Sequence, residues 1–268
     1  MSSLVRILSD LHLGHRVSRI ESAEQLRPLI AGAGRVIFNG DTWQELARLF
    51  RERSGSMLAD LERICAEEGA EPVFLSGNHD PGWPGPGWAE LAGGRILVTH
   101  GDAVFPDGSP WSREALTRQD RVGALWERYQ EVIGDPAARI VLAREMALLL
   151  RAGEYPRGKH LWQRAFDAVR PPRRALEMLR VWATQADAAA AFAERYFPRA
   201  EIVVKGHFHR AGIWHRRGRL VVNLGAFMNP CPAMWADFDG GWFRCGKVDE
   251  SGTSFRFGEL SGVWRVRG

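Results

Sequence analysis

Short apolar runs alternate with polar, helix-like segments along the first hundred residues. The runs are rich in branched residues and are followed by turn formers, a pattern that predicts buried strands at residues 4–8, 36–38, 73–75 and 96–98. Amphipathic stretches at 21–31 and 56–68 separate the first three runs and predict helices. Strands that alternate with helices at this spacing predict an α/β domain.

The pattern changes between residues 111 and 197, where apolar positions recur at helical spacing and Pro171-Pro172 interrupts the stretch. Beyond it the pattern predicts strands again, at residues 202–204, 220–224, 234–238, 242–248 and 255–257. The Gly- and Pro-rich segment 81–88 predicts a rigid surface loop. The simplest architecture is a single domain over residues 1–268 with a helical cap insertion at about 111–197.

Composition narrows the class of protein. A chain of 268 residues has the size of one large domain or two small ones. Its 45% hydrophobic and 25% charged residues exclude a disordered or collagen-like chain. No apolar run approaches the ~18 residues of a membrane span, and the first residues lack the pattern of an export signal. Cys65, Cys231 and Cys245 lack metal spacing and suit a reducing compartment, so we expect a cytoplasmic protein.

Polar clusters directly follow five of the predicted strands. They are Ser9-Asp10-Leu11-His12, Gly40-Asp41, Gly77-Asn78-His79-Asp80, His100-Gly101-Asp102 and Gly206-His207-Phe208-His209. Because ligand sites in α/β sheets gather at the carboxyl ends of strands, we expect the five clusters to converge on one crevice. Burying so many ionisable groups together is costly unless a cation offsets their desolvation.

The donor types in these clusters indicate which cation. Imidazole, carboxylate and amide oxygen without thiolate suit borderline divalent metals such as Mn²⁺, Fe²⁺ or Zn²⁺. Alternate residues of an extended chain lie on one side of it, which makes Asp10 with His12 and His207 with His209 local pairs. The candidate ligands are too many for one tetrahedral ion and suit two ions about 3.5–4 Å apart. The sequence therefore predicts two divalent metal ions, with manganese the first choice and iron or zinc the alternatives.

Taken in order, the five clusters resemble the signature of the calcineurin-like metallophosphoesterases. They extend from Asp10 to His209, about three-quarters of the chain. The resemblance implies an α/β fold of the metallophosphoesterase type, a sandwich of two mixed β-sheets flanked by helices, with a dimetal site on one rim. It also implies metal-dependent hydrolysis of phosphomonoesters or phosphodiesters, in which a hydroxide between the two ions is the nucleophile.

Matching the family motifs position by position assigns the residues their roles. The resemblance gives the first ion Asp10, His12 and His209, the second ion Asn78, His100 and His207, and both ions the bridging Asp41. His79 matches a histidine that faces the substrate phosphate and protonates the leaving oxygen as general acid. Asp80 matches a carboxylate that orients that imidazole. His15, near the first motif, is expected in an exposed loop.

Other functions remain open. Ser9 to Gly14 and the helical insertion are similar to the bacterial UDP-2,3-diacylglucosamine pyrophosphatases, although those enzymes have arginine where His79 stands. The first motif also resembles DNA-repair nucleases of the superfamily, but no nucleic-acid recognition module is visible, so a nucleic-acid partner is not predicted. Some superfamily members have lost catalysis and act as protein-binding scaffolds. We expect a phosphorylated small-molecule or lipid-linked substrate; peripheral membrane contact and oligomeric state stay open.

The insertion carries a concentration of positive charge. Residues 151–180 contain eight basic and three acidic side chains, together with Tyr155, Trp162 and Phe166. A basic, aromatic cap of this kind could hold the non-reacting part of an anionic or amphiphilic substrate, and neutralising Arg173 and Arg174 together is expected to raise KM for the natural substrate.

Overall fold

The computed structural model of the chain describes residues 3–106, 108, 119–150 and 172–266, without the side chains of 172–174. Its strands form two mixed sheets. The first has six strands in the order β11 (Ser254–Arg265), β10 (Trp242–Ser251), β9 (Met234–Asp239), β1 (Val5–Leu8), β2 (Arg35–Asn39) and β3 (Glu71–Leu75). The second has five in the order β4 (Trp88–Leu91), β5 (Ile96–Thr99), β6 (Ile202–Lys205), β8 (Arg219–Asn223) and β7 (Gly212–Arg216).

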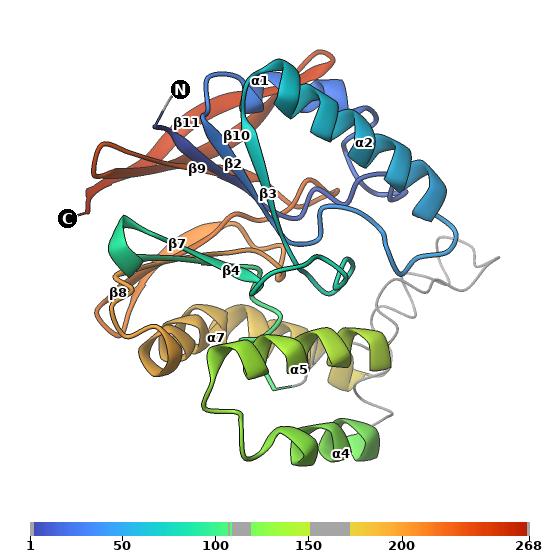
Figure 1. The fold of residues 1–268 in the computed structure, drawn as a ribbon, viewed down its shortest axis with the longest axis vertical. Helices are drawn as coiled ribbons and strands as arrows, with labels where there is room; N and C mark the ends of the chain where they lie inside the picture. Colours follow the sequence, from blue (N-terminus) through green and yellow to red (C-terminus); the bar gives the residue numbers. More distant parts are fainter. Residues whose placement is uncertain (1–2, 107, 109–118, 151–171, 267–268) are drawn as a thin grey trace.

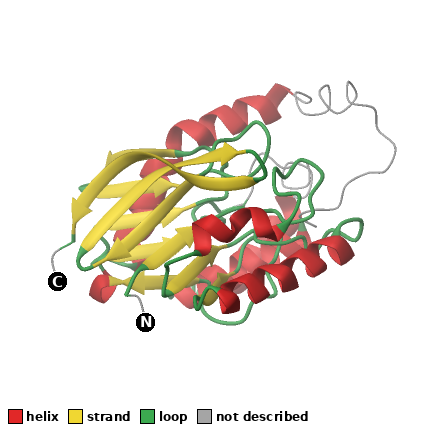
Figure 2. Ribbon diagram, turned by 90° about the horizontal axis from the view of Figure 1, so that it is seen from above, coloured by secondary structure: helices red, strands yellow, loops and turns green. Residues whose placement is uncertain are grey.

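Helices cover the outer faces of both sheets (Figure 1 and Figure 2). On the six-stranded sheet these are the 3₁₀ turn η1 (Ala23–Leu26), α1 (Arg27–Ile30) and α2 (Arg51–Glu67), and a second turn, η2 (Ala92–Gly94), joins β4 to β5. On the five-stranded side lie α4 (Gln119–Tyr129), α5 (Pro136–Leu149) and α7 (Pro172–Tyr196). Asp135 caps α5 by accepting hydrogen bonds from two backbone N–H groups of its first turn. The predicted α/β class, two mixed sheets flanked by helices, is confirmed.

Strand alternation explains why the central strands have continuous apolar runs. Successive side chains of a strand point to opposite faces, and here both faces are buried. In β2, Val36 and Phe38 pack under α1 and α2, whereas Ile37 faces the second sheet. In β6, Val204 faces the first sheet, whereas Val203 packs against α7. Three apolar layers therefore stack through the molecule and fix the strands whose ends carry the polar clusters.

The sequence predictions that fail concern edges and short helices. The predicted helix at 21–31 is η1 followed by one turn of α1, closed at its start by a capping box at Ser22. Strands β4 and β7 were not predicted, and Trp88 begins β4 where a surface loop was expected. Both are edge strands with half-exposed side chains, which leave no continuous apolar run. The stretch predicted at 255–257 continues to Arg265, paired along β10.

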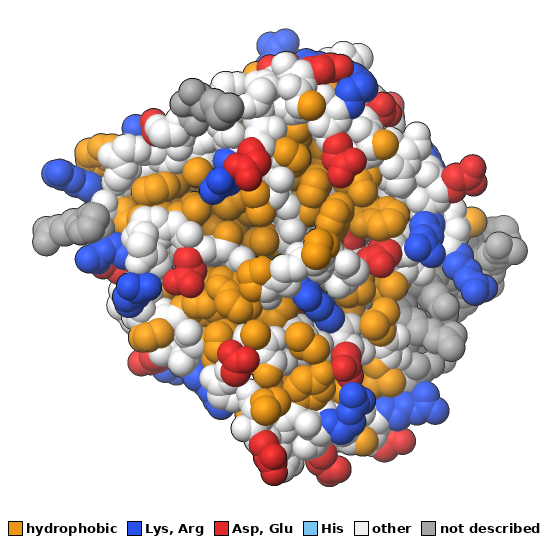
Figure 3. All heavy atoms as spheres, viewed as in Figure 1, with side chains coloured by type: hydrophobic (Ala, Val, Ile, Leu, Met, Phe, Trp, Pro, Cys, Tyr) orange, Lys and Arg blue, Asp and Glu red, His pale blue; other side chains and the backbone are white. Residues whose placement is uncertain are grey.

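The two sheets leave their shared core partly open on one face. The edge strands β3 and β4 carry half-buried apolar residues, among them Val73, Phe74 and Leu91. Figure 3 shows apolar side chains gathered across the middle of this face, in the region of β3 and β4 in Figure 1, with charged groups around them. Among the residues that the structure describes, no helix is long and apolar enough to cross a membrane.

Candidate metal centre

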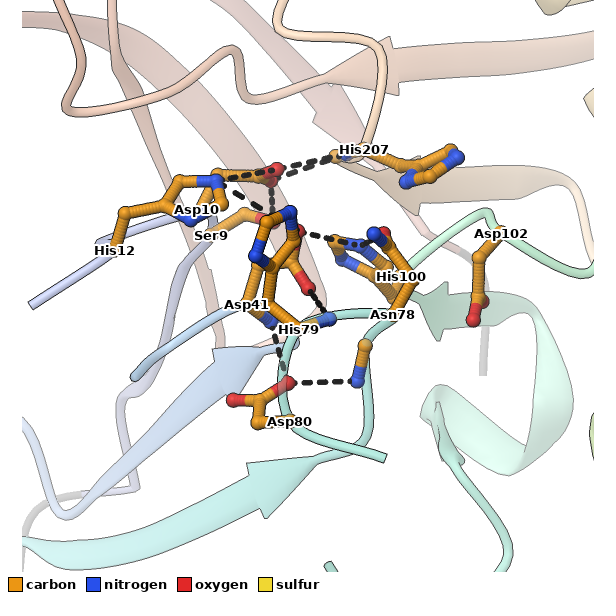
Figure 4. A network of polar contacts seen from close by, with 12 residues as sticks. Ser9, Asp10, His12, Asp41, Asn78, His79, Asp80, His100, Asp102 and His207 are labelled. Carbon is orange, nitrogen blue, oxygen red and sulfur yellow. Dashed lines mark hydrogen bonds and ion pairs between the residues drawn. The ribbon is translucent and has the colours of Figure 1, made fainter. Parts of the chain in front are cut away.

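The five polar clusters meet at one rim of the sandwich. Strands β1, β2 and β3 are parallel neighbours in the first sheet, and β5 and β6 are parallel neighbours in the second. Each of the five ends in one of the clusters, so all five chain turns lie at the same end of the two sheets. Figure 4 shows the side chains that these turns bring together: Asp10, His12, Asp41, Asn78, His79, His100 and His207.

Unusual backbone geometry marks this rim. Seven non-glycine residues of the described chain have a positive φ, and five of them are candidate ligands: Asp10 (52°), His12 (47°), Asp41 (50°), His207 (66°) and His209 (51°). This region is unfavourable for residues with a Cβ, at a cost of about 1–2 kcal/mol each. The fold accepts that cost at the points where the chain turns its ligating side chains into the crevice.

The glycines of the motifs permit the close approach of these turns. A Cβ on Gly206 would lie 1.9 Å from Asp10 Oδ2. A Cβ on Gly40, which has a φ of +75°, would lie 2.5 Å from the His100 ring. Glycine is therefore required before His207 and before Asp41 because other turns of the site occupy the space of a side chain.

The first half of the site contains Asp10, His12, Asp41 and His209, whose potential ligand atoms all lie within 4.8 Å of one another. His12 Nε2 is 3.2 Å from His209 Nε2 and 3.6 Å from Asp41 Oδ2, and His209 Nε2 is 3.1 Å from Asp10 Oδ1. The backbone N–H of His207 donates to the Asp10 carboxylate at 3.1 Å, which ties the ends of β1 and β6 together.

The second half contains Asp41, His100 and His207, again within 4.8 Å of one another, with Asn78 beside them. His100 Nε2 lies 3.4 Å from Asp41 Oδ2 and 3.3 Å from Asn78 Oδ1. His207 Nε2 is 3.1 Å from the Gly108 carbonyl, an acceptor that orients this ring. The loop that follows β5 therefore contacts the site through Gly108.

Asp41 belongs to both halves. Its Oδ1 accepts a hydrogen bond from the backbone N–H of His79 at 2.8 Å. Its Oδ2 is left facing His100, His12 and His79, whose Nε2 atoms lie 3.4, 3.6 and 4.0 Å away. One carboxylate oxygen thus stands between the two sets of donors.

The donor set fits a divalent metal. Carboxylates, imidazoles and one amide oxygen converge without a thiolate, and the side chains of Asp10, His12, Asp41 and His100 are 2% exposed or less. Such a cluster of buried acceptors is stable only with cations among them, whether protons or a metal ion. The residues therefore form a site that could bind metal.

The charges of Asp41 and His100 lower the pKa of the aspartate and raise that of the histidine. Burial would raise the pKa of Asp41, but the positive charge of His100, and then that of His79, holds it well below its usual range. Burial would lower the pKa of His100, but Asp41 and Asp10 raise it well above its ordinary value. The proton on His100 thus supplies the positive charge beside Asp41 that a bound metal ion would supply instead.

Asp80 is placed differently from the expectation. Its two oxygens accept hydrogen bonds from backbone N–H groups and one indole, namely those of Asp41, Thr42, Trp43, Gly77 and Trp83. The structure shows no hydrogen bond from Asp80 to the His79 ring. Because the carboxylate is fully buried among these donors, it fastens the Asp41 turn to the Gly77 turn instead of orienting the imidazole.

Gln44, which was not predicted from the sequence, occupies the position expected for Asp80. Its amide lies 3.1 Å from His79 Nδ1 at one end and 2.9 Å from His12 Nδ1 at the other. Gln44 follows Asp41, which belongs to both halves of the site, by three residues in a turn, and that spacing is the one signal that could have drawn attention to it. His15 also differs from the expectation, because it is 6% exposed and its ring lies 6.2 Å from that of His12.

The expected basic cap lies outside the described side chains, apart from Glu177 and Arg180 in α7. The described part of α7 contacts the turn that carries His207 and His209. Trp182 Nε1 donates to the Phe208 carbonyl at 3.1 Å, and Gln185 accepts a hydrogen bond from the fully buried Lys205. This helix is therefore packed against the turn that carries two of the candidate ligands.

Comparisons with known proteins give similarities of overall fold. No family model and no curated protein matches the sequence. Among solved structures, a conserved Streptococcus pneumoniae protein described as a predicted phosphoesterase is 16% identical, with 91% of this chain and 88% of that chain covered and a TM-score of 0.38. Vps29 from Entamoeba histolytica, complexed with Zn²⁺, is 13% identical over 91% of each chain, with a TM-score of 0.42. A cold-active protein-tyrosine phosphatase of a Shewanella species is 13% identical over 92% of this chain and 78% of that chain, with a TM-score of 0.39.

Proposed function

We propose that the protein is a metal-dependent hydrolase of phosphomonoesters or phosphodiesters. The observation that carries the proposal is the shared carboxylate, because Asp41 Oδ2 faces His12 from one half and His100 from the other. A carboxylate in this position suits two divalent ions that lie side by side, an arrangement that proteins use for phosphoryl and related hydrolytic chemistry.

In this proposal Asp10, His12 and His209 hold the first ion, Asn78, His100 and His207 hold the second, and Asp41 bridges them. Mn²⁺ is our first choice, with iron or zinc as alternatives, because these nitrogen-rich sets disfavour Mg²⁺. When bound, the two ions would withdraw charge from the phosphoryl oxygens and supply the nucleophile at neutral pH.

Exposure indicates where a substrate would enter. The side chains of His79 and His209 are 15% and 28% exposed, whereas those of the other histidines that face Asp41 or Asp10 are 1% exposed. A phosphate that reaches the site past these two rings would meet Nε2 of His79, which lies 4.0 Å from Asp41 Oδ2. His79 is thus the proposed catalytic residue at the leaving oxygen, and Asp80 positions the backbone around it.

The substrate class is proposed on the same chemistry. The metal site recognises a phosphoric ester of a small molecule, and a lipid-linked pyrophosphate of the UDP-2,3-diacylglucosamine kind is the alternative that assays must separate. The three cysteines are free, the state expected in a reducing compartment, which supports a cytoplasmic enzyme.

Metal removal and reconstitution test the proposal. The purified protein is stripped with a chelator and reloaded with Mn²⁺, Zn²⁺ or Mg²⁺. It is then assayed on p-nitrophenyl phosphate, bis-p-nitrophenyl phosphate and a nucleotide-sugar lipid. We expect no turnover without metal, and Mn²⁺ should restore more activity than Mg²⁺. Full activity after exhaustive metal removal would contradict the proposal, and turnover of the lipid alone would assign the pyrophosphatase activity.

A further inference from the structure

One fully buried amide contacts two of the site's histidines. The Gln44 side-chain nitrogen lies 2.9 Å from Nδ1 of His12, and its oxygen lies 3.1 Å from Nδ1 of His79. The two rings pack edge to face with their centroids 4.9 Å apart. Gln44 therefore influences a proposed metal ligand and the proposed catalytic histidine at the same time.

The direction of each hydrogen bond decides where each ring carries its proton. In the orientation shown by the structure, the amide N–H₂ donates to His12 Nδ1, which leaves the His12 proton on Nε2. That Nε2 points at His209 Nε2, 3.2 Å away, and at Asp41. A ring that binds an ion through Nε2 needs its lone pair there and its proton on Nδ1, so it needs an acceptor where the amide nitrogen now lies.

His79 also needs a hydrogen-bond acceptor at Nδ1 if it transfers a proton. A general acid starts as an imidazolium, which donates from both nitrogens and therefore also needs an acceptor at Nδ1. Gln44 has one oxygen, and the nitrogen at its other end can only donate. The two rings thus compete for a single acceptor.

We propose that in the metal-loaded site Gln44 gives its oxygen to His12 and its N–H₂ to His79, so that His79 donates a hydrogen bond from Nε2 without transferring its proton. The inference rests on the proposed metal-dependent function. Gln44 is then a positioning residue for both rings, and His79 stabilises charge on the substrate oxygen instead of acting as the expected general acid.

The change requires little movement and conserves protons. A half-turn of the terminal amide exchanges its oxygen and nitrogen while the backbone stays fixed by the hydrogen bond from Gln44 N to Ser54 Oγ at 2.8 Å. The His12 proton leaves Nε2 and one arrives at Nδ1, while on His79 the proton leaves Nδ1 and one arrives at Nε2. Each ring stays neutral, and water carries the exchanged protons.

Two substitutions of similar shape separate the two contacts. Gln44→Met fills the space without hydrogen bonds, whereas Gln44→Glu offers an acceptor oxygen to both rings. Gln185→Met is the matched control, because Gln185 is equally buried but contacts Lys205 and Asn223 instead of the two histidines. The test combines Zn²⁺ affinity, from competition with a chelator, with ¹⁵N spectra of histidine-labelled, Zn²⁺-loaded protein that report which ring nitrogens carry protons.

We expect wild-type protein with Zn²⁺ to carry one proton on Nδ1 of His12 and one on Nε2 of His79. Gln44→Met should bind Zn²⁺ about 10–100-fold more weakly, and the His79 proton should no longer be held on one ring nitrogen. Gln44→Glu should keep the Zn²⁺ affinity while His79 becomes protonated on both nitrogens. Gln185→Met should unfold more easily yet leave the spectra of both rings unchanged.

The proposal is overturned if His79 of the Zn²⁺-loaded wild type carries protons on both nitrogens. It is also overturned if Gln44→Met keeps both the Zn²⁺ affinity and the proton positions, or if Gln185→Met reproduces its effects. These readouts do not depend on turnover, so a protein that binds Zn²⁺ but hydrolyses no phosphoester would refute the proposed function and still decide the role of Gln44.

Discussion

The two halves of the candidate metal site differ in the groups that contact the outer nitrogens of His12, His100 and His207. In the second half, His100 Nδ1 lies 3.0 Å from the Asn39 carbonyl and His207 Nε2 lies 3.1 Å from the Gly108 carbonyl. In the first half, His12 Nδ1 meets the side-chain amide of Gln44. A carbonyl can only accept, so it fixes one tautomer, whereas an amide can supply either partner.

The halves also differ in the proton that an ion must displace. Burial holds the pKa of His12 well below its ordinary value, against the opposing charge of Asp41. The pKa of His100 is raised, because the charges of Asp41 and Asp10 outweigh its burial. In the first half the pKa of His209 is raised to about 10, because its hydrogen bond with Asp10 outweighs its burial. An ion must therefore expel a proton from His209 in the first half and from His100 in the second.

The largest expected effect comes from the residue that both halves share. Asp41→Asn removes the negative charge that faces His12 and His100 and replaces one carboxylate oxygen with an amide group. We expect both ions to be weakened together and phosphoesterase turnover to fall by at least about 10³-fold, since each ion contributes several kcal/mol. Metal content by elemental analysis and the rate on p-nitrophenyl phosphate measure this. Loss of one ion with the other retained would show that the halves are separate sites.

His79→Ala should have the next largest effect. A hydrogen-bond donor at developing charge contributes about 10²–10³-fold, and this contribution does not require a poor leaving group. We therefore expect similar losses of kcat on an alkyl phosphate and on p-nitrophenyl phosphate, with metal content near wild type. A loss confined to the alkyl ester would instead identify His79 as a general acid. It would then contradict the proposal that Gln44 donates to His79 and accepts from His12.

Gly40→Ala tests the half that the backbone holds. The new Cβ would lie 2.5 Å from the His100 ring at a φ of +75°, so His100 must shift away from Asn39 and Asp41. We expect the affinity for the ion bound by His100 to fall about 10–100-fold. Gly32→Ala is the control, because Gly32 has a φ of +78° with nothing within 4 Å of the added Cβ. Titration calorimetry with Zn²⁺ on both variants separates the clash from backbone strain, and equal effects would refute the role of the close approach.

The strands that were predicted from the sequence and those that were not differ in their burial. Asp10, His12, Asp41, His100 and His207 were found because each follows a strand that is buried on both faces and therefore has a continuous apolar run. Strands β4 and β7 lie at sheet edges, where half-exposed residues leave no such run. Local pattern predicts the strands with continuous apolar runs and the polar turns after them, but not β4 and β7, the two edges of the second sheet.

The contacts of the site were harder to predict than its members. Asp80 follows His79 directly, but its carboxylate turns to the backbone N–H groups of two neighbouring turns. Gln44 is distant from His79 in sequence, and a lone glutamine has no signature of its own. Which side chain meets a ring nitrogen depends on how the turns after β2 and β3 pack, and that is set by tertiary structure.

The smallest expected effect is on stability in acid, and it concerns the turn of the first half. His15 follows His12 and packs on Phe50 with ring centroids 5.1 Å apart, and burial lowers its pKa from 6.5 to about 4. Below pH 6.5 the unfolded chain takes up a proton that the folded chain does not bind until about pH 4. The free energy of unfolding should therefore fall across this window by about 3 kcal/mol from His15 alone. His15→Asn keeps an acceptor for Val17 N and cannot titrate, so urea denaturation from pH 7 to pH 4 should show a shallower loss. Parallel curves for the variant and the wild type would show that acid does not act on this half through His15.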